Sequence, residues 1–270
     1  IFEVARQRGA NSEAPHLWKD LAGAWPMQEG AGDRVYDVSR HGNYGTLRNM
    51  DLATGWTAVE KGRVLKFDGV DDYANIGTTD HLNFAGDFTL ATWARQDESG
   101  RVLRCIAGKT QFGGDTYSEY YIATASGKYS GAIRDGSGAP GRMFADTDYV
   151  VGEWYHLAIR RLNNACNLLV NGAQQSTTRT VSGSSGSWYM QFRLAASNVG
   201  YYFKGAIFGT LAYSRGLASA EIQQLYEDPW AMYRIRPRVF RVAIIEAPPA
   251  VQIFSRRQFG PRIGTRQVQV

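Results

Sequence analysis

The sequence has no long hydrophobic run: none of its apolar stretches approaches the ~18 residues of a membrane-spanning helix. No membrane span is therefore expected, and the opening IFEVARQRGANSEAP lacks the apolar core of a secretory signal. Only two cysteines occur, Cys105 and Cys166, which excludes a disulfide-rich scaffold. Both lie in apolar, strand-like stretches, which favours two buried thiols and leaves a disulfide bridge as the alternative.

Motifs of hydrolytic enzymes are also missing. Glycosidases need two carboxylates that face one sugar, and no strand-like segment carries such a pair; Asp68, Asp71 and Asp72 are close together but have the spacing of a turn. The four histidines have no neighbour at metal-ligand spacing: His16, His41, His81 and His156. No nucleophile-elbow motif occurs, so the sequence predicts a protein without enzymatic activity.

Alternating apolar and polar residues dominate residues 20–215, interrupted by Gly, Asn, Asp and Ser turns. The segment 87–95 is apolar on both faces, which is typical of an interior strand. Asn171 and Gly172 form the strongest short hairpin signal. The pattern predicts an all-β fold, a two-sheet antiparallel jelly-roll sandwich of roughly a dozen strands.

The chain is expected to have three parts. These are an N-terminal arm (1–19), a jelly-roll domain (20–228) and an extended basic C-terminal arm (229–270). One short helix is predicted at the end of the domain, with Ser219 as its N-cap and Pro229 as its stop.

Five segments occur in a familiar order: GAWPMQEGAGDRVYDVSRHGNYGTL (23–47), LKFDGVDDYANIG (65–77), GDFTLATWAR (86–95), GEWYHLAIRRLNNACNLLVNG (152–172) and KGAIFGTLAYSRGLASAEIQQLY (204–226). The series resembles laminin-G-like, concanavalin A-like jelly-roll domains over residues 20–228. The resemblance implies the same sandwich fold that the alternation predicts.

The same resemblance implies one structural calcium ion, held by Asp37 together with Asn43 or a nearby loop carbonyl. The family often has Ile-Asp-Glu in its final strand, where this chain has Ile207, Phe208 and Gly209, so an acid that would strengthen the site is missing. In the alternative interpretation Asp37 caps a turn by accepting hydrogen bonds from backbone N–H groups.

Aromatic clusters near predicted loops suggest a carbohydrate-binding surface, because sugar rings stack on exposed aromatic faces. The candidate residues are Tyr117, Tyr120, Trp188 and Tyr201. With 15 tyrosines, 12 phenylalanines and 7 tryptophans, however, the sandwich must also place many aromatic rings in its core. Packing is therefore the alternative role for each of them.

The net charge of +5 belongs to the C-terminal arm. Residues 229–270 hold eight arginines, no lysine and one acid, Glu246, so the rest of the chain has a net charge of −2. The apolar stretches RVFRVAII and VQIF would expose unpaired strand edges if left free. We therefore expect the arm to dock on another protein chain through Arg234, Arg236, Arg238, Phe240, Arg241, Ile244, Ile245 and Phe254. The absence of lysine favours a protein partner over nucleic acid.

A jelly roll followed by DPWAMYRIRPR resembles virion-associated proteins of tailed phages. The resemblance implies a non-enzymatic structural subunit on the virion exterior, such as a capsid decoration, fibre or adhesin protein, repeated as a homo-oligomer. The alternative is a carbohydrate-binding module in an extracellular setting that recognises surface glycans. Truncation after Tyr226 is expected to leave a folded domain that no longer joins its assembly.

Overall fold

The chain divides into two units, Ile1–Arg236 and Pro237–Val270. The computed structural model describes residues 11–60, 62–110, 120–134, 142–181, 183 and 190–236. The second unit lies outside the described residues.

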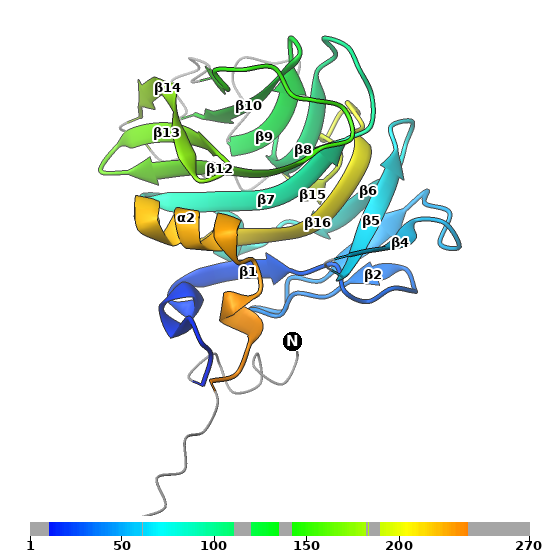
Figure 1. Cartoon of the computed structure of the whole chain (residues 1–270), viewed down its shortest axis with the longest axis horizontal. Coiled ribbons are helices and arrows are strands. Elements are labelled where there is room, and N and C mark those ends of the chain that lie inside the picture. Colours follow the sequence, from blue (N-terminus) through cyan, green and yellow to red (C-terminus); the bar gives the residue numbers. More distant parts are fainter. Residues whose placement is uncertain are drawn as a thin grey trace, which may run out of the picture. The chain divides into compact units, whose positions relative to one another are not determined.

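In the described residues of the first unit, sixteen strands form two eight-stranded sheets in which every pair is antiparallel (Figure 1). The first sheet has the order β14 (Ala173–Thr180), β13 (Ala165–Val170), β12 (Trp154–Leu162), β7 (Phe88–Gln96), β16 (Lys204–Tyr213), β5 (Gly62–Asp68) and β4 (Trp56–Val59), with β1 (Leu21–Trp25) also on β16. The second sheet has the order β11 (Arg142–Phe144), β10 (Lys128–Ile133), β9 (Tyr120–Ala125), β8 (Arg104–Lys109), β15 (Phe192–Leu194), β6 (Tyr73–Gly77), β3 (Gly45–Arg48) and β2 (Arg34–Val35). The predicted two-sheet sandwich is confirmed.

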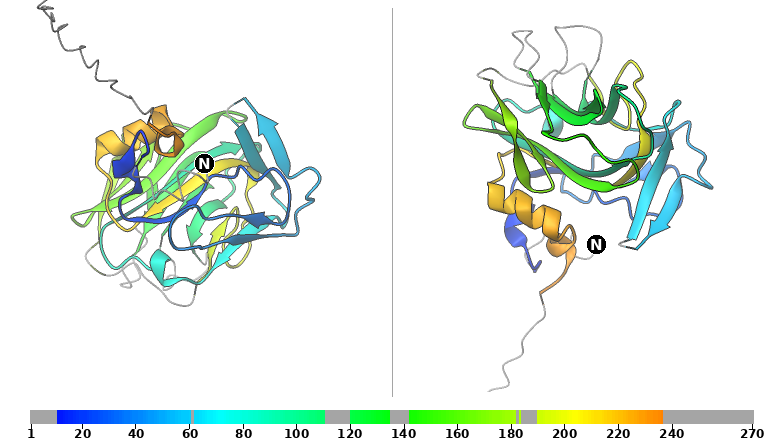
Figure 2. Two further views of the ribbon diagram at one scale, coloured as in Figure 1. Left: turned by 90° about the horizontal axis from the view of Figure 1, so that it is seen from below. Right: turned by 45° about the horizontal axis from the view of Figure 1, so that its top comes forward.

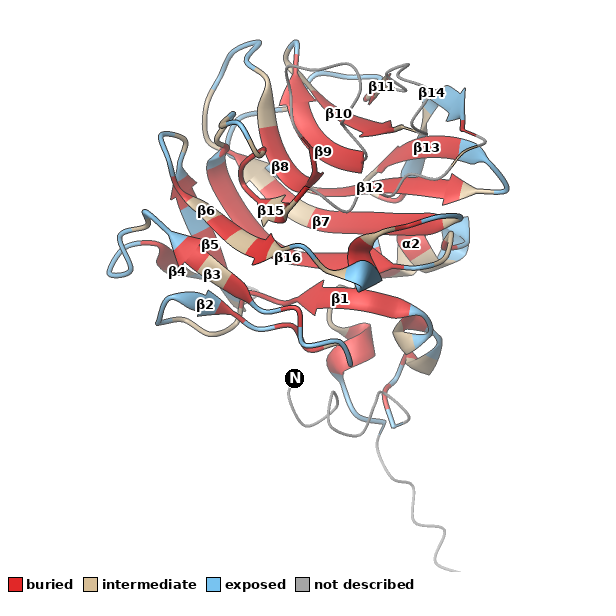
Figure 3. Cartoon of the chain, turned by 180° about the vertical axis from the view of Figure 1, so that it is seen from behind, coloured by how far each residue is buried: buried red, intermediate tan, exposed pale blue. Residues whose placement is uncertain are grey.

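Strand β16 is the centre of the first sheet. One edge pairs with β7, while the other edge pairs first with β5, where Ala206 lies opposite Lys66, and then with β1, where Thr210 lies opposite Trp25. The edge strand β14 is mostly exposed, whereas the central strands are buried (Figure 3).

Strand β7 is buried on both faces, as predicted. Phe88 and Leu90 point into the core between the sheets, whereas Ala91 and Trp93 point outward. The outward face is covered by the helix α2 (Ser219–Glu227), which crosses the first sheet beside β7 and β16 (Figure 1). Burial on both sides explains why this strand has no polar face.

The two ends of the described chain lie against each other on the outer face of the first sheet. We call residues 11–18 and 229–236, with their 3₁₀ turns η1 (Pro15–Trp18) and η3 (Ala231–Tyr233), the terminal clasp. Figure 2 (left) shows the blue η1 segment beside the orange η3 segment. The Trp18 indole donates to the Met232 carbonyl at 2.7 Å, and the Trp18 and Tyr233 rings meet edge to face at 5.9 Å.

The clasp corrects two predicted boundaries. Residues 11–19 and 229–236 belong to the folded unit, because Leu17, Met232 and Tyr233 are buried in one hydrophobic cluster with α2. The local pattern after Pro229 predicted an arm that docks on another protein chain, but the apolar side chains of residues 229–236 are covered by the chain's own N-terminal segment.

The predicted helix exists, but its cap differs. Ala218 is the N-cap residue and Ser219 is already helical. The Ala218 N–H donates to the Glu221 carboxylate at 2.9 Å. Glu221, and not the predicted Ser219, therefore supplies the side-chain hydrogen bond at this end of the helix. The Ser219 hydroxyl instead contacts the Arg160 guanidinium at 3.2 Å.

Two smaller predictions are confirmed. Asn171 and Gly172 join β13 to β14 with φ values of 49° and 80°, as a hairpin turn with two left-handed residues requires. Cys105 and Cys166 are both buried, and neither is in a disulfide. In the part of the chain that the structure describes, no helix is long and apolar enough to cross a membrane.

Candidate functional site

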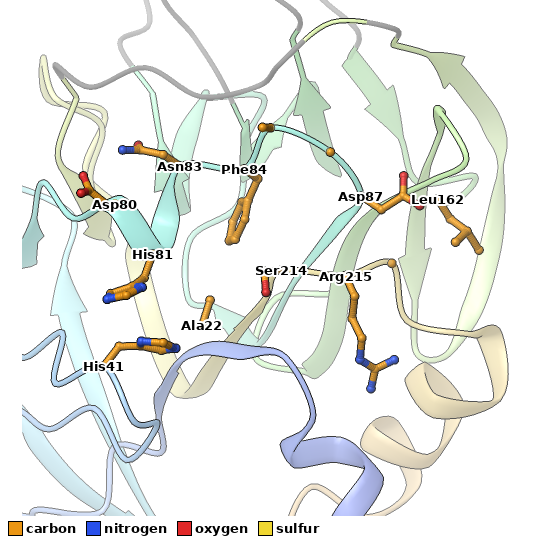
Figure 4. Close-up of a pocket in the computed structure, with 13 residues that line it drawn as sticks. Ala22, His41, Asp80, His81, Asn83, Phe84, Asp87, Leu162, Ser214 and Arg215 are labelled. Atoms are coloured by element: carbon orange, nitrogen blue, oxygen red, sulfur yellow. The ribbon is translucent and has the colours of Figure 1, made fainter.

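A polar pocket of about 470 Å³ lies at the end of the sandwich where β7 begins and β12 and β16 end (Figure 4). We call it the end pocket. Its wall is made by the segment 80–87, by His41, by Leu162 and by the turn 214–216 that follows β16. Residues far apart in the sequence therefore meet here.

The segment 80–87 is fixed by its inward side chains. Leu82 is the last residue of the 3₁₀ turn η2 (Asp80–Leu82) and is buried. Its carbonyl accepts a hydrogen bond from the Tyr120 hydroxyl at 2.8 Å. Phe84 is buried as well and stacks on Phe88 with ring centroids 4.8 Å apart. These anchors leave the polar residues of the segment facing outward.

Several polar groups of the end pocket keep free hydrogen-bonding capacity. Within the described residues, the Asp80 carboxylate and the His81 ring make no side-chain hydrogen bond, and both residues are exposed. The Asp87 carboxylate accepts one hydrogen bond through Oδ2, from the Asn163 N–H at 3.0 Å. The pocket can therefore offer carboxylate acceptors and an imidazole to a polar ligand.

Arg215 lines the same pocket, but its guanidinium is already hydrogen-bonded within the chain. Its guanidinium forms two hydrogen bonds of 2.8 Å with the Glu221 carboxylate and donates to the backbone carbonyls of His16 and Lys19 at 3.1 Å. The Glu221 pair balances its charge. Arg215 thus holds the wall in place, and the free charge of the pocket comes from Asp80 and Asp87.

The His41 and His81 rings stack at one side of the pocket. Their centroids are 3.8 Å apart with an angle of 34° between the ring planes (Figure 4). Desolvation, and then the neighbouring His81, lower the pKa of His41 below its usual value. A hydrogen bond with the Leu21 backbone opposes this shift and uses one of the two ring nitrogens.

Asp80 and Asp87 stand on opposite sides of the pocket with Phe84 between them (Figure 4). An arrangement of carboxylate acceptors and imidazole rings around a polar pocket suits binding of hydroxyl groups.

The residues predicted to hold calcium do not fit the ion. The Asp37 carboxylate accepts four hydrogen bonds of 2.8–2.9 Å, from the backbone N–H groups of Ala24, Ser39 and Asn43 and from the Ser39 hydroxyl. Its two oxygens have four lone-pair positions, and protein donors use all of them. The Asn43 side-chain carbonyl accepts from the Thr79 hydroxyl at 2.9 Å. The geometry fits the alternative interpretation, in which Asp37 caps a turn.

The acidic cluster after β5 is also a turn, as predicted. Side-chain oxygens of Asp68, Asp71 and Asp72 lie within 4.8 Å of one another. The Val70 N–H donates to Asp68 at 2.8 Å, and the Asp68 N–H donates to Asp72 at 3.0 Å. Burial raises the pKa of Asp72 to about 6.

Two of the four predicted carbohydrate residues, Tyr120 and Tyr201, lie in the part of the chain that the structure describes. The prediction is wrong for Tyr120, which is fully buried between the sheets because its position in β9 points inward. Tyr201 is 40% exposed and lies in the loop before β16. Tyr117 and Trp188 lie outside the described residues.

The predicted docking residues are mostly outside the described chain: Arg238, Phe240, Arg241, Ile244, Ile245 and Phe254. The structure gives Arg234 partners within its own chain, Glu13 at 2.7 Å and Asp228 at 2.9 Å, in place of the predicted external ones. The Arg236 N–H donates to the Asn11 carbonyl at 2.7 Å. Both arginines thus belong to the terminal clasp.

Sequence reasoning missed the end pocket. The segment DHLNFAGD (80–87) joins two strands and carries two acids and a glycine, which was an available signal for a polar loop. Its proximity to His41 and to the turn 214–216 depends on the pairing of β1 with β16, which no local pattern indicates.

The family of the chain follows from a comparison with known protein families. Residues 68–223, more than half of the chain, match the model of the concanavalin A-like lectin/glucanases superfamily. The chain belongs to this superfamily. Its described residues form a lectin-like jelly-roll domain. No curated protein matches the chain.

Solved structures support the concanavalin A-like fold. The binding domain of Paraclostridial Mosquitocidal Protein 1 is 14% identical with a TM-score of 0.59, over 79% of this chain and 53% of that chain. Trypanosoma rangeli sialidase, in a complex with 2,3-difluorosialic acid, is 13% identical with a TM-score of 0.59, over 85% and 38%. The receptor-binding domain of botulinum neurotoxin C/D mosaic serotype is 11% identical with a TM-score of 0.58, over 77% and 51%. The chain thus spans about half or less of these proteins, and the likeness concerns the fold alone.

Proposed function

We propose that this concanavalin A-like domain is a non-enzymatic glycan-recognition module that binds sugar hydroxyl groups in the end pocket. The observation that carries the proposal is the set of polar side chains with free hydrogen-bonding capacity, Asp80, His81 and Asp87, around one pocket of about 470 Å³. Carboxylates accept hydrogen bonds from hydroxyl pairs, and burial of Phe84 beneath them keeps the loop in place. The toxin binding domains and the sialidase among its structural neighbours agree with a recognition role.

The charge of the end pocket favours neutral sugars. Asp80 and Asp87 contribute two carboxylates, and the nearest lining cation, Arg215, is already paired with Glu221. A sialic acid carboxylate would meet like charge there. We therefore expect the ligand to be a neutral glycan.

A glycan array tests the proposal. We expect the intact chain to bind neutral glycans in preference to sialylated ones, and Asp80→Ala combined with Asp87→Ala to abolish binding. Asp33→Ala removes an exposed acid outside the pocket and is the matched control. Equal binding by the double variant and the wild type would contradict the assignment of the site, and turnover of a bound glycan would contradict the non-enzymatic role.

We propose further that residues 237–270 attach the domain to a larger assembly. The assembly we favour is a phage virion. Two observations support this: the chain divides into units at Arg236, after the jelly roll, and the sequence of residues 237–270 is basic and interrupted by prolines. The module would then face the outside of the particle, as repeated copies, with an extracellular carbohydrate-binding protein as the alternative setting.

Size-exclusion chromatography with light scattering tests the docking role. The intact chain should associate with copies of itself or with its assembly, whereas a chain ending at Arg236 should stay folded and monomeric. Identical behaviour of the two chains, in isolation and in the presence of the assembly, would contradict the docking role.

A further inference from the structure

A second pocket of about 340 Å³ lies on the outer face of the first sheet, beside the C-terminal end of α2. We call it the aromatic pocket. Its main lining residues are Glu60, Trp93, Trp154, His156, Phe208 and Tyr226. The strands β7, β12 and β16 place Trp93, Trp154, His156 and Phe208 on one face, Glu60 follows β4, and α2 contributes Tyr226. It shares no lining residue with the end pocket.

The rings of this pocket meet at steep angles. Phe208 packs edge to face against Trp93, with centroids 6.4 Å apart and planes at 81°. It packs in the same way against Trp154, at 6.3 Å and 70°. Trp154 and Tyr226 are 36% and 39% exposed and stand at the rim. Several aromatic walls therefore enclose one space at different orientations.

His156 is the unexplained group of the pocket. It is 1% exposed, its ring lies 4.6 Å from Trp93 and 6.3 Å from Tyr226, and neither of its nitrogens has a hydrogen-bond partner within the described residues. A buried polar group without a partner destabilises a fold, so its retention points to a ligand. Burial lowers the pKa of His156 to about 3, so the ring is neutral and keeps a lone pair.

The electrostatics of the pocket favour a positive ligand. Glu60 is exposed and is the only charged side chain among the lining residues described by the structure. Arg95 lies over the Trp154 ring at 5.5 Å, but its charge is balanced by Asp97 at 2.7 Å. Aromatic faces carry negative potential, and a neutral imidazole adds an acceptor.

We propose that the aromatic pocket binds an organic ammonium ion. The walls of Trp93, Trp154, Phe208 and Tyr226 would surround the alkylated nitrogen, Glu60 would balance its charge, and the His156 lone pair would accept an N–H where the ligand has one. Choline-type headgroups and lysine side chains, methylated or free, share this chemistry. The site is separate from the end pocket, so it does not depend on glycan recognition.

The test compares a positively charged ligand with a neutral ligand of the same shape. The intact chain is titrated with choline and with 3,3-dimethylbutan-1-ol, a neutral molecule of the same shape, by calorimetry and tryptophan fluorescence. We expect choline to bind at least tenfold more tightly. Glu60→Gln should weaken choline binding severalfold and leave the alcohol unchanged, whereas Asp33→Asn, which removes an equal charge elsewhere, should change neither. Equal binding of choline and the alcohol would overturn the proposal.

Trp154→Leu removes a rim wall at an exposed position and should reduce choline binding at least tenfold without changing the melting temperature. Trimethyllysine amide and free lysine amide, run beside choline, distinguish the two sources: tighter binding of either amide assigns the site to a lysine side chain, and tighter binding of choline assigns it to a headgroup. Absence of binding by all three probes at millimolar concentration would overturn the proposal. So would loss of glycan binding in Trp154→Leu, which would make the pocket a sugar subsite.

Discussion

At the scale of single residues, Asp37 shows how one carboxylate can hold an entire loop. It accepts hydrogen bonds from the backbone N–H groups of Ala24, Ser39 and Asn43, which joins strand β1 to the loop that carries His41. We expect Asp37→Ala to lower the free energy of unfolding by on the order of 3 kcal/mol, because it leaves buried donors unsatisfied. Urea denaturation measures the loss.

Two measurements on Asp37 distinguish its role as a turn cap from a role as a calcium ligand. Because protein donors fill its oxygens, addition of Ca²⁺ or a chelator should leave the melting temperature of the wild-type chain unchanged. Asp33→Ala, at an exposed position, should cost less than about 0.5 kcal/mol. A melting temperature that rises with Ca²⁺ and is insensitive to it in Asp37→Ala would contradict this view.

His156 makes stability depend on pH. Its pKa is about 3 in the folded chain, below the ordinary value of 6.5, so the unfolded chain binds the proton more readily. Stability is complete above about pH 6.5 and falls as the pH decreases toward 3. The loss from this residue at pH 5 is about 2 kcal/mol. Urea denaturation at pH 5 and pH 8 should show a smaller difference for His156→Phe than for the wild type; equal differences would contradict the buried, neutral state.

At the scale of elements, the terminal clasp is the part of the fold on which the domain boundary depends. Met232 is fully buried beside Leu17 and α2, whereas Ile235 in the same segment is 43% exposed. Met232→Ala should lower the free energy of unfolding by about 3 kcal/mol and Ile235→Ala by less than about 0.5 kcal/mol. Equal effects in urea denaturation would show that the segment 229–236 is not packed on the domain.

The clasp also reverses an expectation drawn from the sequence. Truncation after Tyr226 removes Trp230, Met232 and Tyr233 from a hydrophobic cluster, so it should destabilise the domain instead of leaving it intact. A chain that ends at Arg236 keeps these contacts and should melt like the intact chain. Thermal unfolding of the two truncated chains, measured side by side, distinguishes the two boundaries.

Local patterns predicted those elements whose signals are contained in a few residues. The two apolar faces of β7 and the turn at Asn171 and Gly172 are of this kind. The strands β2, β11 and β15 have only two or three residues and therefore no period to detect. Trp230 packs on residues that are distant in the sequence, which no local pattern indicates. The apolar character of its segment alone suggested a partner on another chain.

The candidate sites were beyond local prediction for a related reason. His41 and His81 are forty residues apart in the sequence and stack only because the loops after β2 and before β7 meet at one end of the sandwich. Tyr120 showed the converse error: a tyrosine in an aromatic stretch was taken as exposed, although every residue of β9 is buried. Burial is decided by which sheet a strand joins.

At the scale of the whole molecule, one jelly roll presents two chemically different hollows. The end pocket carries free carboxylates and imidazoles, and the aromatic pocket on the first sheet carries rings around a neutral histidine. They share no lining residue, so substitutions in one should leave the ligand of the other unaffected. The unit up to Arg236 contains both, and a chain ending there should bind as the intact chain does.

The most direct test of the central claim is nuclear magnetic resonance of the ¹⁵N-labelled chain, titrated with the neutral glycan that binds best on the array. Glycan recognition at the end pocket predicts that the largest amide shifts occur at His81, Ala85, Gly86, Asp87 and Gly216. Shifts confined to other surfaces, with none in residues 80–87, would contradict the account.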